Sequence, residues 1–231
     1  MILFIKHIAI EGPGTLGEFF NNQTTWKTKI VELEKEEALP SLDECEAVIS
    51  LGGPMNVYET RKYPFLEKEE NFFKLALEKQ IPILGICLGA QLLAKVCGSK
   101  IKKANNKEIG WHKVSLTEDG RQDNLFSSVP SKFDVFQWHE DMFELPKGAL
   151  LLAESQDCPN QAFRFGKNAY GLQFHIEVTP EMIETWVNIY KEEAKRFNAQ
   201  EILLESYKTK EVFRRQADII YFNFARIVSN K

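Results

Sequence analysis

Short, continuously apolar runs alternate with helical stretches over the first hundred residues, and this alternation is the strongest constraint on the fold. The run Ala47–Leu51 is followed by a helical pattern over Phe65–Lys79, and the next run is Ile81–Ile86. Apolar runs without polar alternation suit strands that are buried on both faces, as in a parallel sheet covered by helices. The pattern therefore predicts a three-layer αβα sandwich with a mainly parallel central sheet.

From Ser99 onward the pattern changes to successive strand-like segments, among them Trp111–Leu116 and Phe133–Gln137, with few helices between them. We expect these segments to form a strand-rich insertion in a flavodoxin-like α/β fold. Helix is predicted again over Pro180–Phe197 and Glu201–Ile227, where Thr179 is the expected cap of the first helix.

The domain organisation follows from length and from the absence of internal boundaries. No repeat, low-complexity tract or linker divides the 231 residues, which predicts a single domain over 1–231 with a helical C-terminal extension from about residue 181. The apolar and aromatic residues between Trp186 and Phe224 are expected to pack on the sheet, and a surface for a partner protein is the alternative.

Charge and cysteine content exclude several classes of function. The chain has 29 Lys and Arg against 33 Asp and Glu, a net charge of -4 that gives no long-range attraction to nucleic acid. No apolar stretch approaches the ~18 residues of a membrane helix, and Lys6 comes too early for a signal peptide. The four cysteines include no CxxC pair, so we expect reduced thiols in a cytoplasmic protein without a metal or another cofactor.

The segment Gly85-Ile86-Cys87-Leu88-Gly89 places a cysteine between an apolar strand and a helix. This is the setting of a nucleophile elbow, a strained turn in which the residues two before and two after the nucleophile need minimal side chains. A helix N-terminus favours a thiolate, and the N–H of Leu88 can stabilise an oxyanion at the same place. Cys87 is therefore the candidate nucleophile, and an ordinary buried cysteine is the alternative.

A histidine and a glutamate two positions apart end another strand-like run. Side chains two apart on a strand project to one face, so His175 and Glu177 are expected to lie side by side. The histidine would hold the proton exchanged between sulfur and leaving group, and the carboxylate would fix its orientation. Alone, either residue is equally compatible with a solvated surface, but together with Cys87 they predict a Cys-His-Glu triad.

Three sequence blocks, Gly52-Gly53-Pro54, Gly85–Gln91 and Gly171–Glu177, resemble in order and spacing the class I (triad-type) glutamine amidotransferases. The likeness spans roughly residues 46–180 and is greatest to the amidotransferase domain of GMP synthetases and its stand-alone relatives. It implies hydrolysis of the side-chain amide of glutamine, with release of ammonia, through a γ-glutamyl thioester.

The resemblance also implies a role for individual residues. Cys87 corresponds to the nucleophile, His175 to the acid/base and Glu177 to its orienting carboxylate. The N–H groups of Gly53 and Leu88 correspond to the oxyanion hole, although the glycine block alone is equally compatible with a simple turn.

Two further segments are implied to contact the substrate. Gln91 lies one helical turn past Cys87 and resembles a family glutamine that helps to hold the substrate. The segment from residue 137 follows a predicted strand and resembles the one whose backbone grips the amino-acid end of glutamine; its candidates are Gln137, Trp138 and His139. A solvent-facing glutamine and a satisfied loop histidine are the alternatives. The turn Glu11-Gly12-Pro13-Gly14 is expected to line the pocket.

Three functions compete. The first is release of ammonia from glutamine, for which a separate synthase subunit is the expected acceptor because the fifty residues after Glu177 contain no nucleotide-binding loop. The second is a γ-glutamyl peptidase or hydrolase that uses the same triad on γ-glutamyl amides or peptides. The third is a non-catalytic regulatory module, against which the intact triad argues.

Overall fold

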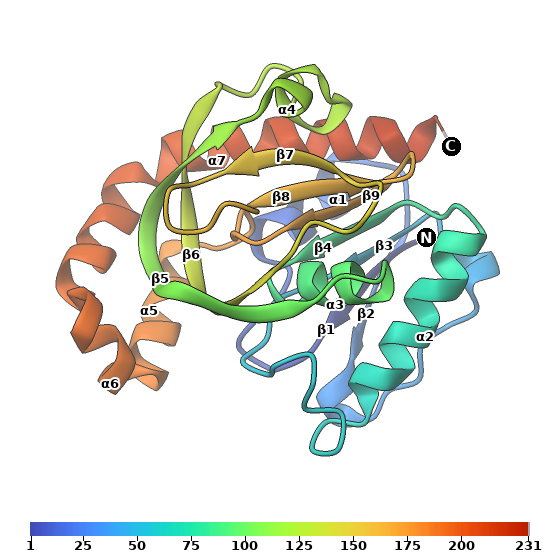
Figure 1. The fold of residues 1–231 in the computed structure, drawn as a ribbon, viewed down its shortest axis with the longest axis horizontal. Coiled ribbons are helices and arrows are strands. Elements are labelled where there is room, and N and C mark those ends of the chain that lie inside the picture. The colour runs from blue at the N-terminus through green and yellow to red at the C-terminus, as the bar shows by residue number, and fades with distance from the viewer. Residues whose placement is uncertain (231) are drawn as a thin grey trace.

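A single twisted sheet carries all the strands in the described part of the chain, residues 1–230 apart from the side chain of residue 105. In this computed structural model the strand order is β2-β1-β3-β4-β9-β8-β7-β5-β6. The strands are β1 (Ile2–Lys6), β2 (Thr28–Glu32), β3 (Ala47–Ser50), β4 (Ile83–Ile86), β5 (Ile101–Leu116), β6 (Lys132–Phe143), β7 (Leu150–Glu154), β8 (Ala162–Phe165) and β9 (Ala169–Leu172). The first five in spatial order are parallel and have the arrangement of a flavodoxin-like sheet (Figure 1).

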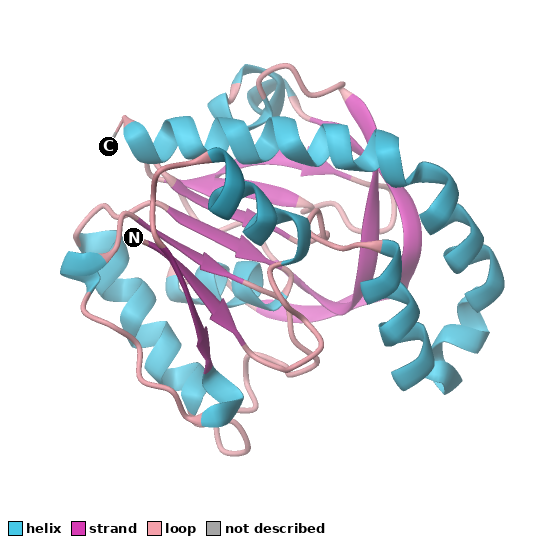
Figure 2. Cartoon of the chain, turned by 180° about the vertical axis from the view of Figure 1, so that it is seen from behind, coloured by secondary structure: helices cyan, strands magenta, loops and turns pink. Residues whose placement is uncertain are grey.

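Helices cover both faces of the parallel strands (Figures 1 and 2). They are α1 (Gly14–Gln23), α2 (Phe65–Glu78), α3 (Leu88–Val96), α4 (Glu118–Gln122), α5 (Pro180–Ile189), α6 (Lys191–Ala194) and α7 (Ala199–Ser229). Side chains alternate along β1, so Ile2 and Phe4 join a core with α1 and α7, whereas Leu3 and Ile5 join a core with α2 and α3. The predicted αβα sandwich is confirmed.

The strand-rich region extends the same sheet instead of forming a separate layer. Strand β8 pairs antiparallel with β9, and β7, β5 and β6 follow, also antiparallel. The predicted strands Trp111–Leu116 and Phe133–Gln137 are only parts of the longer β5 and β6. The segment Gln137–Asp141, expected to follow a strand, therefore lies within β6, because its charged residues are tolerated where the two long strands leave the core.

The C-terminal helices are broken where the sequence predicts one helix over Pro180–Phe197. Tyr190 has non-helical backbone angles between α5 and α6, while Thr179 caps α5 as expected by accepting from the N–H of Met182. Buried side chains of α7, such as Ile220 and Phe224, share a core with β1 and α1, which supports the prediction of one domain. None of the helices described is both long enough and apolar enough to span a bilayer.

Both ends of the chain hold the backbone just after β9. The amide of Thr15 in α1 donates to the carbonyl of Glu177 at 2.9 Å. The hydroxyl of Tyr221 in α7 donates to the carbonyl of Ile176 at 2.6 Å and lies 2.8 Å from the Thr15 hydroxyl oxygen. Helices that are about 200 residues apart in sequence thus meet at one short segment.

Candidate active site

A cavity of about 190 Å³ opens at the carboxyl ends of the parallel strands. Its lining comes from the turn after β1, the loop after β3, the start of α3, strand β6, the segment after β9, and helices α5 and α6. The side chains and backbone that line it belong to Glu11, Gly53, Pro54, Met55, Asn56, Cys87, Gln91, Lys107, Trp138, His139, Glu140, Asp141, His175, Trp186, Tyr190 and Glu193. The strand order reverses between β1 and β3, and open α/β sheets bind ligands beside such a reversal.

Cys87 lies on a strained turn between β4 and α3. Its φ of 51° is unusual for a residue with a side chain, and its amide donates to the carbonyl of Leu172 at 2.8 Å. A Cβ at Gly85 would lie 2.6 Å from the amide nitrogen of Ala90, and one at Gly89 would lie 2.4 Å from the carbonyl oxygen of Ser50. Both flanking positions therefore require glycine, and the turn has the geometry predicted for a nucleophile elbow.

His175 and Glu177 meet in the segment that follows β9. The Nδ1 of His175 donates to Oε1 of Glu177 at 2.7 Å, and both residues are buried. Strand β9 ends at Leu172, so the expectation that the pair shares a strand face is wrong in its reason. Instead, His175 is fixed by its amide, which donates to the carbonyl of Phe136 on β6 at 2.8 Å.

The electrostatic surroundings of His175 favour a charged imidazole. Burial disfavours that charge, but the carboxylate of Glu177 and a hydrogen bond with Cys87 outweigh it and raise the pKa of His175 well above its ordinary value. Its second partner is thus the sulfur of Cys87, which brings the three candidate triad residues together.

Gly53 and Leu88, the expected oxyanion donors, are neighbours in space. A Cβ at Gly53 would lie 2.8 Å from Cδ2 of Leu88, so glycine lets this backbone approach the start of α3. Leu88 is the first residue of α3, where helix N–H groups have no partner within the helix. Gly53 lines the cavity, and Leu88 directly follows Cys87.

Gln91 contacts the other cavity wall. Its Nε2 donates to the carbonyl of Asp141 at 2.9 Å and to Oε1 of Gln173 at 3.3 Å. Gln173 in turn directs Nε2 to the sulfur of Cys87 at 3.9 Å, a link that sequence reasoning did not assign although it quoted the block containing it. The carbonyl of Trp138 lies 3.9 Å from the same sulfur. This wall therefore presents amide and carbonyl groups beside Cys87.

One protein-family model, described as glutamine amidotransferase class-I, matches residues 19–187. The chain belongs to the class I glutamine amidotransferase family. A relative is the glutamine amidotransferase-like protein YfeJ of Salmonella typhimurium, which is 35% identical over 188 residues, 78% of this chain and 77% of YfeJ. The glutamine-hydrolyzing GMP synthase of Thermosipho melanesiensis is 35% identical over 182 residues, 75% of this chain but only 33% of that protein. A crystal structure of a glutamine amidotransferase from Thermotoga maritima has a TM-score of 0.89 and 36% identity, with 98% of this chain and 97% of that chain covered.

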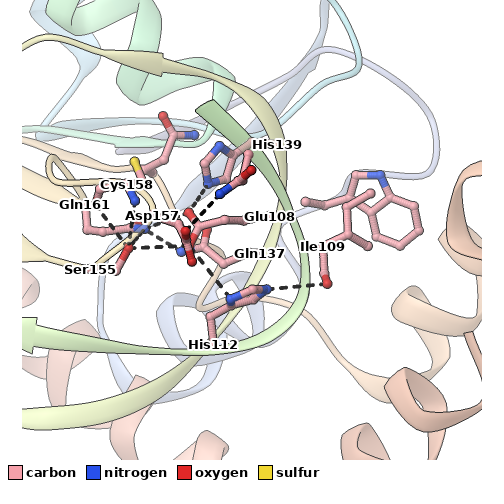
Figure 3. A network of polar contacts seen from close by, with 12 residues as sticks. Glu108, Ile109, His112, Gln137, His139, Ser155, Asp157, Cys158 and Gln161 are labelled. Carbon is pink, nitrogen blue, oxygen red and sulfur yellow. Dashed lines mark hydrogen bonds and ion pairs between the residues drawn. The ribbon is translucent and has the colours of Figure 1, made fainter. Parts of the chain in front are cut away.

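In this class I amidotransferase, a buried polar network supports the wall that contains His139 (Figure 3). Glu108 on β5 receives His139 Nε2 at 3.0 Å and Gln161 Nε2 at 2.9 Å. Gln137 donates to Gln161 at 2.9 Å and is fully buried. Of the candidate substrate contacts, Gln91, Trp138 and His139 thus line the cavity, whereas Gln137 belongs to the network behind it.

The same network contains side chains of metal-binding type. Ligand atoms of Glu108, His139 and Cys158 lie within 4.8 Å of one another. Because the carbonyl of Asp141 can only accept, His139 Nδ1 must donate to it at 3.1 Å, which leaves Nε2 to share a proton with Glu108. Burial raises the pKa of the Cys158 thiol to about 12. These groups serve as hydrogen-bond partners for one another, and the protonated thiol is a poor metal ligand.

Glu11, at the turn after β1, lines this amidotransferase's cavity beside the histidine of the candidate triad. A Cβ at Gly52 would lie 2.3 Å from Oε2 of Glu11 and 2.9 Å from Cε1 of His175, so the carboxylate and imidazole flank the same glycine. Burial raises the pKa of Glu11 to about 7, and the charge of Glu177 adds to this effect, against the opposing influence of His175 and His7.

This shift predicts a pH-dependent gain in stability for Glu11→Gln. Between its ordinary pKa of 4.5 and about 7, folded Glu11 keeps a proton that the unfolded chain has lost, so its contribution to stability is present below 4.5 and lost as pH rises. From pH 4.5 to 8, the free energy of unfolding of the variant relative to wild type should rise by up to about 3 kcal/mol. Urea unfolding of both proteins at several pH values measures this difference. An equal gain in Glu67→Gln, on the exposed face of α2, would contradict the assignment to Glu11.

Proposed function

We propose that this chain hydrolyses the side-chain amide of glutamine and releases ammonia through a γ-glutamyl thioester on Cys87. The observation that carries the proposal is the meeting of Cys87, His175 and Glu177 at one cavity, in a chain of the class I amidotransferase family. These residues come from α3 and from the segment after β9, and each is held by backbone hydrogen bonds that the fold supplies.

The proposed reaction begins with a thiolate at Cys87 and an imidazolium at His175, which the raised pKa of the imidazole favours. The sulfur attacks the side-chain carbonyl carbon, and the N–H groups of Gly53 and Leu88 receive the oxyanion. His175 then gives its proton to the leaving nitrogen, and the C–N bond breaks with release of ammonia. Neutral His175 takes a proton from water as the water attacks the thioester, which yields glutamate and restores the thiolate.

The amino-acid end of glutamine is proposed to bind the wall of Gln91, Trp138 and His139. This wall holds the sulfur within reach of the Trp138 carbonyl, and the network of Glu108 fixes His139 from behind. Of the acidic residues beside it, Glu140 is already paired with Lys103 and Lys107 at 2.7 and 3.2 Å.

A separate synthase subunit is proposed as the acceptor of the ammonia. The related GMP synthase is about three times as long as the part of it that this chain matches, so most of that enzyme has no counterpart here. Glutamine or another γ-glutamyl compound remains the substrate in either case.

Three measurements on the purified chain test the proposal: ammonia from glutamine, amine release from a γ-glutamyl dipeptide, and the mass of the protein after treatment with a diazoketone analogue of glutamine. We expect ammonia and a single adduct on Cys87. Cleavage of the dipeptide without ammonia from glutamine would replace the proposal with a γ-glutamyl hydrolase. Absence of turnover and of any adduct at neutral pH would leave a regulatory module.

A further inference from the structure

The carboxylate of Glu11 is a buried charge that the described residues do not pair. Its exposed fraction is 8%, and it has no hydrogen bond or ion pair within the described part of the chain. The two imidazoles that act on it electrostatically already have carboxylate partners: His7 contacts Glu69 at 2.7 Å, and His175 contacts Glu177 at 2.7 Å. Burying an unpaired carboxylate is costly, so the position indicates a cation that arrives with a ligand.

The backbone around Glu11 is held firmly in place. Its amide donates to the carbonyl of Ile8 at 3.2 Å, and the indole N–H of Trp186 in α5 donates to the carbonyl of Ile10 at 3.1 Å. Trp186 also packs its ring against His175, with 5.0 Å between the ring centroids. Glu11 and the imidazole thus belong to one rigid wall and do not depend on a mobile loop for their approach.

That wall is the one on which the leaving group must lie. In the proposed reaction His175 protonates the departing nitrogen, so this nitrogen faces the imidazole, while the amino-acid end of the substrate lies toward Gln91 and Trp138. Because Glu11 flanks the imidazole at Cε1, its carboxylate faces atoms attached beyond the departing nitrogen. Glutamine itself has no atoms there other than hydrogen.

We propose that Glu11 forms an anionic subsite for the leaving amine, and that the preferred substrates are γ-glutamyl amides whose leaving amine carries a second, protonated amino group. The inference rests on the proposed function and names the substrate class of that site. The aromatic rings of Trp186 and Tyr190 line the same part of the cavity and suit an alkyl chain that ends in a cation.

The bonds broken and formed are those of the glutamine reaction. The sulfur of Cys87 forms the thioester as the C–N bond to the diamine breaks, and His175 supplies the proton that makes the departing nitrogen an amine. The second ammonium group of the diamine stays protonated and paired with Glu11 until the product leaves. Water then hydrolyses the thioester, so the products are glutamate and a diamine.

The test compares three γ-glutamyl amides that differ in the end of the leaving amine: 1,4-diaminobutane, n-butylamine and 4-aminobutanoate. Their binding is measured by calorimetry on Cys87→Ala and on Cys87→Ala with Glu11→Gln, and their turnover on the corresponding proteins that keep Cys87. We expect the diamine amide to bind about tenfold more tightly than the butyl amide, and this ratio to fall to within about twofold without Glu11.

Glu140→Gln is the matched control, because Glu140 lines the same cavity but is already paired with lysines; it should keep the tenfold ratio. Equal binding of the diamine and butyl amides, tighter binding of the anionic amide, or an unchanged ratio without Glu11 would each overturn the subsite. Since the binding measurements need no catalysis, loss of turnover with every substrate would count against the proposed function alone.

Discussion

Replacement of Cys87 by alanine should lower kcat for glutamine hydrolysis by at least about 10⁴-fold, because no other group at the cavity can form the thioester. Cys87 lies at the elbow with its sulfur near the Trp138 carbonyl and the His175 imidazole. The alanine side chain fits the same backbone turn only with strain that the cysteine already has, so the fold should be retained. Ammonia release under saturating glutamine measures the effect, with circular dichroism as a check of folding.

Cys97→Ala provides the control for this loss. Cys97 caps the other end of α3, and burial raises the pKa of its thiol to about 12, so it is held as a thiol away from the cavity. We expect its activity to stay within about twofold of wild type. Activity of Cys87→Ala within tenfold of wild type would rule out the thioester route.

Glu177→Gln should lower kcat by about 10²- to 10⁴-fold with a small change in KM. The carboxylate raises the pKa of His175 and accepts from its Nδ1, whereas an amide can do only the second and can present its NH₂ group instead. Less imidazolium means less thiolate at Cys87. The rate at which iodoacetamide alkylates Cys87 should therefore fall with kcat, and its pH profile should move to higher pH.

A purely structural role for Glu177 would not produce that shift in the alkylation profile. Glu181→Gln, four positions later on the exposed first turn of α5, should leave both kcat and the alkylation profile unchanged. Full activity of Glu177→Gln, or a loss of kcat with an unchanged alkylation profile, would contradict the role assigned to the carboxylate.

Local sequence rules predicted the elbow because its causes are local. Apolar residues before Cys87 make a buried strand, and the glycines at 85 and 89 are required by backbone atoms that lie within a few residues or on the adjacent β3. The alternation of buried runs and helices likewise determined the order of the parallel strands, since each connection must cross a face of the sheet.

Other features depend on contacts that no local pattern encodes. The pairing of His175 with Glu177 was expected, but what positions the histidine is the carbonyl of Phe136 on a distant strand. Gln137 lies behind the cavity because Gln161, 24 residues later, holds its amide. The importance of Glu11 could not be weighed from sequence, since it follows from the glycine at 52 that lets its carboxylate approach His175.

The clamp on residues 176 and 177 by Thr15 and Tyr221 has a consequence for the order in which the protein matures. A nascent chain that still lacks α7 contains every residue of the triad but not the hydroxyl that fixes the carbonyl beside Glu177. Ribosome-bound intermediates should therefore be silent, and competence should arise only after the last helix leaves the exit tunnel. Such late assembly would keep an unfinished polypeptide from consuming the cell's glutamine.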